Sequence, residues 1–430
     1  MAMNRSTTAL VLTLVIGVST TNLFSQGTSA PVGPKLSETL ARNLAGATGT
    51  DVPEDRRAKA YSKLLEAQRF IWRSNPVRSR SGGQGAVKFA RNALQVALEL
   101  DPKLAEAYTA LAELSLSSPP TDVDEAVQLA LMAVKVDPNN FGGHRILARL
   151  FTYKSNLGNS GTNDRTYAAK ALGEWKEVAR LDPRNAEAWA FLSEFYGLAG
   201  MQNEQIDSLK KWVAASTPVE TQFYKRVMGG QSDLSPENAS LKLGAALINA
   251  GRSADAVEVL SLLVSDEPSN AEAISLLRQS LASADARTSA VAIESLQQAV
   301  FANPDSPVLV SLLAQVQARS GKVDDGARVL RDAIERTKAS DLAAASGLQV
   351  TLGDILVGAD RLAEAVTAYE DALKLRGLDR PRTVLETDRT FAFQVYEKLI
   401  TTYRKANRLA EARSAVERAR QLLGNDVFAG

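Results

Sequence analysis

Arg145, Arg149 and Tyr153 have the spacing in this sequence that most suggests a binding site. Residues four apart share one face of a helix, so these three side chains would project in a row. Two guanidinium groups on one face could bind an acidic peptide side chain or another carboxylate through paired hydrogen bonds. The alternative is that both arginines are solvated or paired with acidic residues of the chain itself.

Other kinds of chemistry have little support in the residue types. The chain has no cysteine and one histidine, His144, which excludes disulfides, thiolate metal sites, a cysteine nucleophile and a histidine metal cluster within one chain. It has no His-Glu-x-x-His, Gly-x-Ser-x-Gly or dinucleotide-binding motif. The acidic residues lie at expected helix starts or before prolines, where capping and the helix dipole explain them. We therefore expect no enzyme, no metal and no cofactor; an active site concealed in a groove is the alternative.

The composition is that of a folded helical chain without a dominant charge. Hydrophobic residues make up 45% of the 430 residues, aromatic residues only 6%, and the formal net charge is +1. A charge so close to zero provides no overall field toward nucleic acid or an anionic membrane surface. We expect no nucleic-acid partner.

The first residues have the pattern of a secretory signal. Arg5 precedes an apolar run of ten residues, Ala9–Val18, which is too short to span a bilayer comfortably, and small residues such as Ser25 and Gly27 follow. We expect residues 1–25 to be a cleaved signal peptide and the protein to be periplasmic or secreted. A retained membrane anchor or a disordered tail is the alternative. No later stretch is long and apolar enough to span a membrane.

The rest of the chain changes character near residue 55. Residues 26–54 are rich in Pro, Gly, Ser and Thr, which predicts a flexible linker with one short helix around Leu36–Leu44. From 55 to 430, apolar residues recur at helical spacing in blocks separated by short breaks. We expect this region to be a single helical array.

The breaks in this region repeat at a regular distance. Each expected stop is an acidic residue or asparagine followed by proline: Asp101-Pro102, Asp137-Pro138, Asp182-Pro183, Glu267-Pro268 and Asn303-Pro304. Pro102 and Pro138 are 36 residues apart, as are Pro268 and Pro304. Proline cannot continue a helix and disfavours helical angles in the residue before it. A recurrent helix stop at such a period indicates a repeat architecture.

The residues between the stops resemble the tetratricopeptide repeat. That pattern has large residues at repeat positions 4, 11 and 24, Leu at 7, small residues at 8, 20 and 27, and Pro at 32. Residues 237–270 match it with Leu243, Gly244, Leu247, Gly251, Ala256, Leu260 and Pro268. The segments 307–340, 346–379 and 393–426 match similarly, with Gly326, Gly353 and Tyr396 among the matching residues.

Five further segments fit with insertions or more weakly: 56–102, 105–138, 141–183, 186–218 and 271–304. Insertions near 154–165 and 219–236 should be loops, and Phe223, Tyr224 and Val227 in the second could form an extra helix. The resemblance implies an all-α, right-handed superhelical solenoid of about nine helix-turn-helix repeats. It also implies that His144, Trp175, Trp189 and Trp212 are core residues.

In this family the concave face is lined mainly by positions 2, 5, 9, 12 and 13 of the first helix in each repeat. By position, this places Arg145, Arg149 and Tyr153 there, with Glu106, Glu113 and Glu194 in neighbouring repeats. Other such positions are Gln279, Gln315, Arg319 and Asp354. The resemblance implies that an extended segment or a helix of a partner binds in this groove. The chain's own N-terminal segment could also occupy it.

The sequence therefore predicts an exported, non-catalytic scaffold that binds a protein or peptide and assists assembly of an envelope complex. The alternative is a structural component of a polysaccharide export, pilus or secretion machine. Because the last helix is followed by no further polar helix, we also expect self-association through an exposed C-terminal end that includes Leu422 and Leu423.

Overall fold

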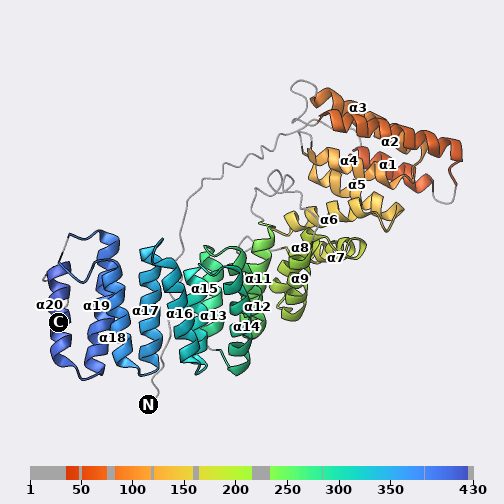
Figure 1. Ribbon diagram of the computed structural model, residues 1–430. Coiled ribbons are helices and arrows are strands. Elements are labelled where there is room, and N and C mark those ends of the chain that lie inside the picture. Colours follow the sequence, from red (N-terminus) through yellow and green to blue (C-terminus); the bar gives the residue numbers. More distant parts are fainter. Residues whose placement is uncertain are drawn as a thin grey trace, which may run out of the picture. The chain divides into compact units, whose positions relative to one another are not determined.

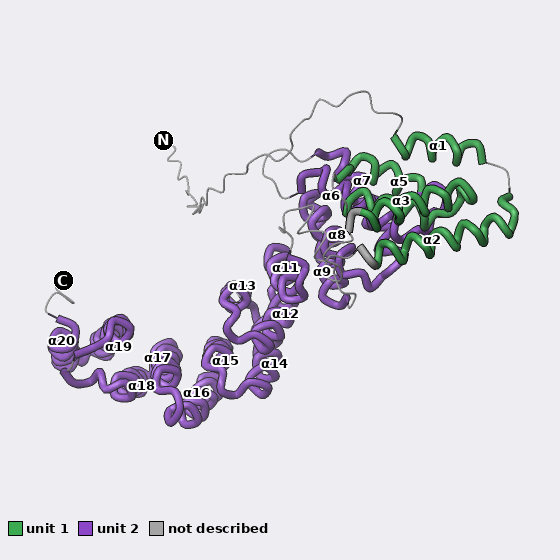
Figure 2. Tube along the Cα trace, turned by 90° about the horizontal axis from the view of Figure 1, so that it is seen from above, with its two compact units in different colours: residues 1–132 green, residues 133–430 purple. Residues whose placement is uncertain are grey.

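The computed structural model describes residues 35–47, 51–74, 83–117, 121–157, 164–215, 233–282, 284–381 and 383–424. Regular structure in these ranges consists of 19 helices (Figure 1). The chain divides into two compact units, residues 1–132 and 133–430 (Figure 2). The predicted signal peptide and the predicted helix around Phe223 lie outside the described residues.

Unit 1 begins with a helix that the sequence places in the linker. The unit contains α1 (Leu36–Gly46), α2 (Glu54–Ser74), α3 (Gly83–Leu100), α4 (Ala105–Ser117) and the start of α5 (Val123–Val136). Helix α1 confirms the short helix expected around 36–44, and it is packed rather than free. Leu40 and Leu44 are buried, and the Ser37 amide and hydroxyl both donate to the carboxylate of Glu125, at 2.8 and 2.5 Å. Part of the expected linker therefore belongs to the folded unit.

Unit 2 is a row of helix pairs, which Figure 2 shows in sequence order from α6 to α20. Its helices are α6 (Phe141–Lys154), α7 (Arg165–Leu181), α8 (Ala186–Leu198), α9 (Gln202–Ala214), α11 (Pro236–Asn249), α12 (Ser253–Asp266), α13 (Ala271–Ala282), α14 (Ala286–Ala302), α15 (Pro307–Arg319), α16 (Val323–Thr337), α17 (Leu342–Gly358), α18 (Leu362–Leu375), α19 (Glu386–Lys405) and α20 (Leu409–Leu423). Each expected repeat contains one such pair, and we call its members the first and the second helix. The all-α repeat architecture is confirmed.

The predicted helix stops are confirmed. Helices α3, α5, α7, α12 and α14 end directly before the five residue-proline pairs, and all five are second helices. The following first helices α6 and α8 begin with side-chain caps, because Asn140 accepts from the Gly143 amide and Asn185 from the Ala188 amide. Proline and cap together fix these two junctions within a few residues.

Small residues sit where the paired helices approach most closely. A Cβ added at Gly244 would lie 2.6 Å from the Leu260 side chain, and one at Gly353 would lie 2.4 Å from the Tyr369 ring. A Cβ at Gly326 would lie 2.7 Å from the backbone oxygen of Ala314. These are the small positions of the resemblance, so the expected close approach is confirmed for these three pairs.

Replacing Gly326 with alanine is expected to destabilise unit 2. The added methyl group would meet a backbone atom, which cannot rotate away, and overpacking costs about 1–3 kcal/mol. The better helix propensity of alanine returns at most about 1 kcal/mol. The control is Gly358→Ala, where nothing lies within 4 Å of the added Cβ. Urea denaturation should show a lower midpoint for the first variant and an unchanged or higher one for the second.

The pair of α13 and α14 departs from the regular pattern. Most first and second helices pack tightly on each other, as α15 does on α16 and α17 on α18. Helix α13 instead packs mainly on α12 and scarcely on its own partner α14, while α14 packs on α12 and α15. Helix α13 is therefore separated from α14, the second helix of its own repeat.

The C-terminal helix differs from its prediction. Leu422 and Leu423 are 6% and 1% exposed and belong to the core that α15–α20 share. They therefore do not form an exposed end for self-association, because they lie on the inner face of α20 and pack against the preceding helices. Charges introduced at these two positions would test folding rather than association.

Candidate functional site: the groove face of the first helices

Polar side chains join neighbouring first helices of unit 2 along one face. Glu194 of α8 pairs with Lys242 of α11. Asp354 of α17 accepts from Lys398 of α19 at 2.6 Å, and the Arg319 guanidinium of α15 donates to the backbone oxygen of Leu281 at the end of α13. Glu194, Arg319 and Asp354 are all positions that the resemblance implies for the concave side. We call this the groove face.

The cluster of Arg145, Arg149 and Tyr153 is divided by the structure. All three lie on α6, but Arg149 is buried and forms a bidentate pair with Glu187 at the start of α8. Its Nε and second terminal nitrogen donate to the two carboxylate oxygens at 2.6 and 2.9 Å, and both side chains are 5% exposed. For Arg149 the structure therefore shows the alternative, intramolecular pairing. The guanidinium joins two repeats instead of facing a ligand.

The other candidate residues remain at or near the surface. The Arg145 guanidinium lies over the Phe141 ring, 5.6 Å from its centroid, and is half-buried, while Tyr153 is 37% exposed. Glu106 and Glu113 are exposed on α4, which belongs to unit 1. Their role in binding a partner remains a prediction.

Two hydrogen-bond acceptors surround the imidazole of His144, which is buried as expected of a core position. Its Nδ1 lies 2.6 Å from Oε2 of Glu174 on α7, and its Nε2 lies 3.0 Å from the backbone oxygen of Pro138. A carboxylate and a carbonyl both accept, so only the doubly protonated ring satisfies both contacts. The hydrogen bond to Glu174 is the main cause of a raised His144 pKa. When it is doubly protonated, the ring therefore joins α6 to α7 through a charge-assisted hydrogen bond.

Stability is expected to depend on pH through His144. Its pKa in the folded chain lies above the ordinary value of 6.5, so the protonated ring stabilises the fold fully below pH 6.5. This contribution is lost as the pH rises through the folded-state pKa. Urea denaturation at a series of pH values should show this decline in the natural chain but not in His144→Gln. An equal decline in both chains would contradict the assignment.

The groove face contains a depression of about 520 Å³ around α15. Its floor is apolar and comes from the end of α13, from α15, from the start of α16 and from the end of α17. The residues that contribute are Leu281, Ala282, Leu312, Val316, Ala318, Val323, Ile355, Gly358 and Ala359. Arg278, Gln315, Arg319 and Asp354 add polar groups. Three of these four are expected groove positions, and the volume lies in the range of peptide and ligand sites. We call it the α15 groove.

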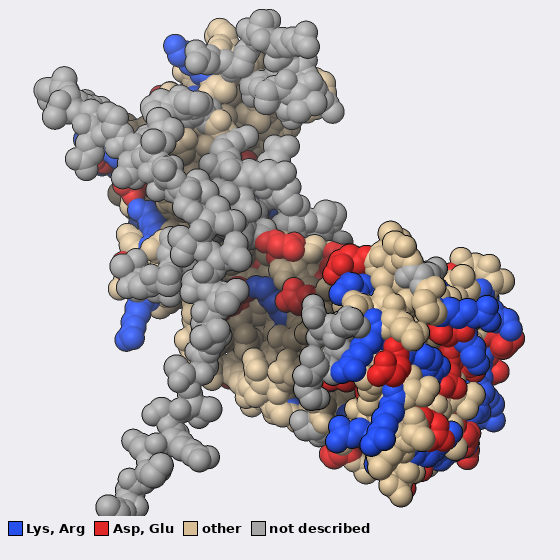
Figure 3. All heavy atoms as spheres, turned by 90° about the vertical axis from the view of Figure 1, so that its left-hand side faces the viewer, with Lys and Arg blue, Asp and Glu red and all other residues tan. Residues whose placement is uncertain are grey.

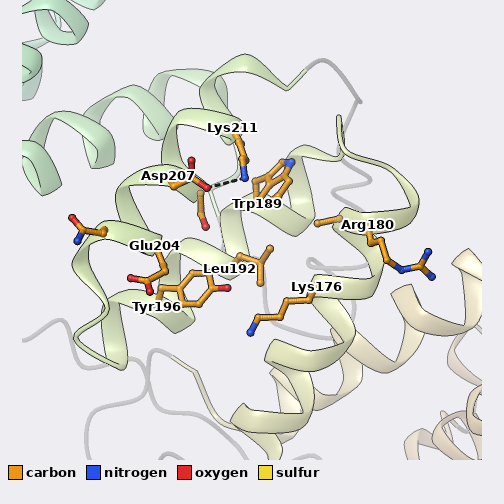
Figure 4. A pocket seen from close by; sticks show the side chains of 11 residues that line it. Lys176, Arg180, Trp189, Leu192, Tyr196, Glu204, Asp207 and Lys211 are labelled. Carbon is orange, nitrogen blue, oxygen red and sulfur yellow. Dashed lines mark ion pairs between the residues drawn. The ribbon is translucent and has the colours of Figure 1, made fainter.

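A second depression, of about 540 Å³, lies between α7, α8 and α9 (Figure 4). Trp189 and Tyr196 line it together with several charged side chains. Figure 4 shows the Lys211 ammonium directed at Asp207, 2.7 Å away, and it lies 4.5 Å from the Trp189 ring centroid. Arg180 pairs with Glu177 and also donates to Asn139. Because these cations are already engaged within the chain, this depression has less to offer a charged ligand than the α15 groove.

The described part of the chain contains no group of three or more His, Cys, Asp or Glu side chains placed to hold a metal ion. Among the same residues, no helix has the length and apolar character needed to cross a bilayer. In the space-filling view, Lys and Arg side chains are interspersed with Asp and Glu over the surface near the C-terminal helices (Figure 3). The surface seen there has no large area of a single charge.

No family model and no curated protein matches the sequence. Parts of the fold are similar to solved tetratricopeptide repeat structures. A protein of Parabacteroides merdae shares 14% identity over 80% of this chain and 99% of its own, with a TM-score of 0.32. A thermophilic protein of Thermus thermophilus shares 18% identity over 52% and 99%, with a TM-score of 0.28. YrrB, described as having an unusual peptide-binding site, shares 12% over 58% and 92%, with a TM-score of 0.25. The helix pairs themselves, rather than these partial likenesses, establish the fold.

Proposed function

We propose that this chain is a non-catalytic scaffold of the tetratricopeptide type that binds a protein or peptide along its groove face. The observation that carries the proposal is the α15 groove, where an apolar floor meets polar side chains at positions expected to contact a ligand. In such a combination, the apolar surface contributes binding affinity, and the few oriented polar groups contribute specificity. Several first helices contribute to it, so a partner would span more than one repeat.

The proposed setting is the bacterial envelope, with a role in assembling an envelope complex. This part rests on the signal-like residues 1–25 and on the absence of cysteine, which suits an oxidising compartment. It can be tested by fusing residues 1–30 to a reporter enzyme that is active only after export. Activity that depends on the apolar run Ala9–Val18 would support export, and an inactive, cytoplasmic fusion would contradict it.

Binding itself is tested by affinity capture. Residues 31–430 would be immobilised and exposed to a native envelope fraction, and retained proteins identified by mass spectrometry. Gly358→Phe places a bulky side chain in the α15 groove at a position where an added Cβ meets nothing within 4 Å. Gly173→Phe is the control, because its Cβ position on α7 is equally open but lies outside the groove.

Partners retained by the natural chain and by Gly173→Phe, but lost with Gly358→Phe, are the expected result. A stable membrane complex captured equally by all three chains would instead favour a structural component of an export, pilus or secretion machine. Recovery of no partner under cross-linking conditions would contradict the scaffold proposal. An Arg149→Glu variant is unsuitable as a control, because it would disrupt the buried pair with Glu187.

A further inference from the structure

The α15 groove has a shape that suits an aliphatic side chain. Its apolar walls include Leu312 and Val316 of α15 and Ile355 of α17, and its edge is formed by small residues such as Ala282 and Gly358. Small residues at an edge let the backbone of a ligand approach closely, and the aliphatic walls exclude water from an apolar side chain that enters the groove. The groove lies beside the end of α13, the first helix that scarcely contacts its own partner α14.

The charge of the α15 groove is positive. Arg278 and Arg319 are both exposed, and Arg278 has no hydrogen-bond or ion-pair partner among the described residues. Arg319 uses one terminal nitrogen to donate to the Leu281 oxygen, and a guanidinium has further N–H groups available. The single acidic group, Asp354, accepts from both Lys398 and the Tyr369 hydroxyl through the same oxygen. Its charge is therefore compensated within the chain, while those of the two arginines are not.

We propose that the α15 groove binds a linear peptide segment in which an aliphatic side chain stands next to an aspartate or glutamate. The aliphatic group enters between α13, α15 and α17, and the carboxylate faces Arg278 and Arg319. Charge-assisted hydrogen bonds to a guanidinium are among the stronger polar contacts in proteins. The inference rests on the proposed scaffold function and specifies the partner's chemistry at this one site.

The test begins with a library of displayed random linear peptides, selected on the immobilised chain. Enriched peptides are synthesised with a fluorescent label, and their affinities are measured by fluorescence anisotropy. Each is made in two forms, one with its acidic residues and one with the corresponding amides. The variants are Arg278→Glu and Gly358→Phe; the controls are Arg287→Glu, an exposed arginine at the start of α14 outside the groove, and Gly173→Phe.

We expect the enriched peptides to combine an aliphatic with an acidic residue. Arg278→Glu, Gly358→Phe and amidation of the peptide should each weaken binding about tenfold or more, equivalent to about 1.4 kcal/mol. Amidation should weaken binding to Arg278→Glu much less than it weakens binding to the natural chain, because one of the two guanidinium groups that face the carboxylate is then replaced by a negative charge. Both control variants should bind as the natural chain does, and circular dichroism should show all four variants folded.

Enriched peptides without acidic residues, or peptides whose affinity is the same in Gly358→Phe, would overturn this inference while leaving the scaffold function standing. Light scattering provides a further outcome. If peptide binding weakens only at chain concentrations where light scattering shows a dimer, the groove is a self-association surface, and this inference is also overturned. Failure to enrich any peptide, together with failure of the envelope capture, would overturn both.

Discussion

Replacing Glu187 with alanine is expected to lower the free energy of unfolding by about 3–5 kcal/mol. The change leaves the Arg149 guanidinium buried at 5% exposure without the carboxylate that accepts from two of its nitrogens. Losing a carboxylate partner costs a buried guanidinium more than the intact pair contributes to stability, since burial removes the water that would otherwise solvate the charge. Glu187 also lies in the first turn of α8, where its negative charge interacts favourably with the positive end of the helix dipole.

The measurement is hydrogen exchange of the α6–α8 amides, because unfolding of a repeat array need not be a single transition. Glu194→Ala is the matched control. Its carboxylate is 39% exposed and pairs with a 41% exposed Lys242, so its loss should cost about 1 kcal/mol or less. The double change Arg149→Leu/Glu187→Leu should recover much of the loss, because no buried charge remains. Equal exchange rates in Glu187→Ala and Glu194→Ala would show that the buried pair has no special role.

Replacing Trp175 with alanine should be comparably damaging, at about 3–5 kcal/mol. Trp175 is fully buried on α7, and its ring stacks on Phe191 of α8 at a centroid distance of 4.9 Å. Its Nε1 donates to the Thr152 hydroxyl of α6 at 2.8 Å. The indole thus fills the junction of three helices, and its removal leaves both a cavity and a hydroxyl that loses its donor.

Two other substitutions separate these contributions. Trp175→Phe retains most of the ring volume but loses the N–H, so it should cost less than the alanine change. Trp189→Ala removes a half-buried ring that lines the depression in Figure 4, and it should cost least. Thermal unfolding followed by circular dichroism provides the ranking. A Trp189→Ala variant as unstable as Trp175→Ala would mean that burial does not distinguish the two side chains.

The repeat boundaries were predictable because their causes are local. A proline after Asp137 or Asp182 ends a helix through its own ring, and a cap such as Asn185 acts within three residues. The small residues at Gly244, Gly326 and Gly353 recur at fixed repeat positions, and each faces a side chain or backbone atom of its own helix pair. Signals of this kind are contained within one repeat, so they can be recognised in a single sequence.

The candidate site was predictable only as a set of positions. Gln315, Arg319 and Asp354 were expected on the groove face by their place in the repeat, and they do line one depression. That depression also involves the end of α13, whose packing on α12 rather than on its own partner α14 no local pattern indicates. Trp189 illustrates the same limit, since its repeat position predicts a core residue while the neighbouring helices leave it half-exposed.

By itself, the sequence determined the helices, their order, their junctions and the small residues that let each pair close. The tertiary structure decided which charged side chains remain available. Arg149 and Tyr153 share a helix, yet only Arg149 is buried, because Glu187 from the next repeat, 38 residues later, provides its partner. Leu423 is covered by the stacking of α20 on α19. Such outcomes depend on the stacking of successive repeats. Because burial removes water from a charged side chain, the buried charge is stable only where the stacking supplies a partner of opposite charge.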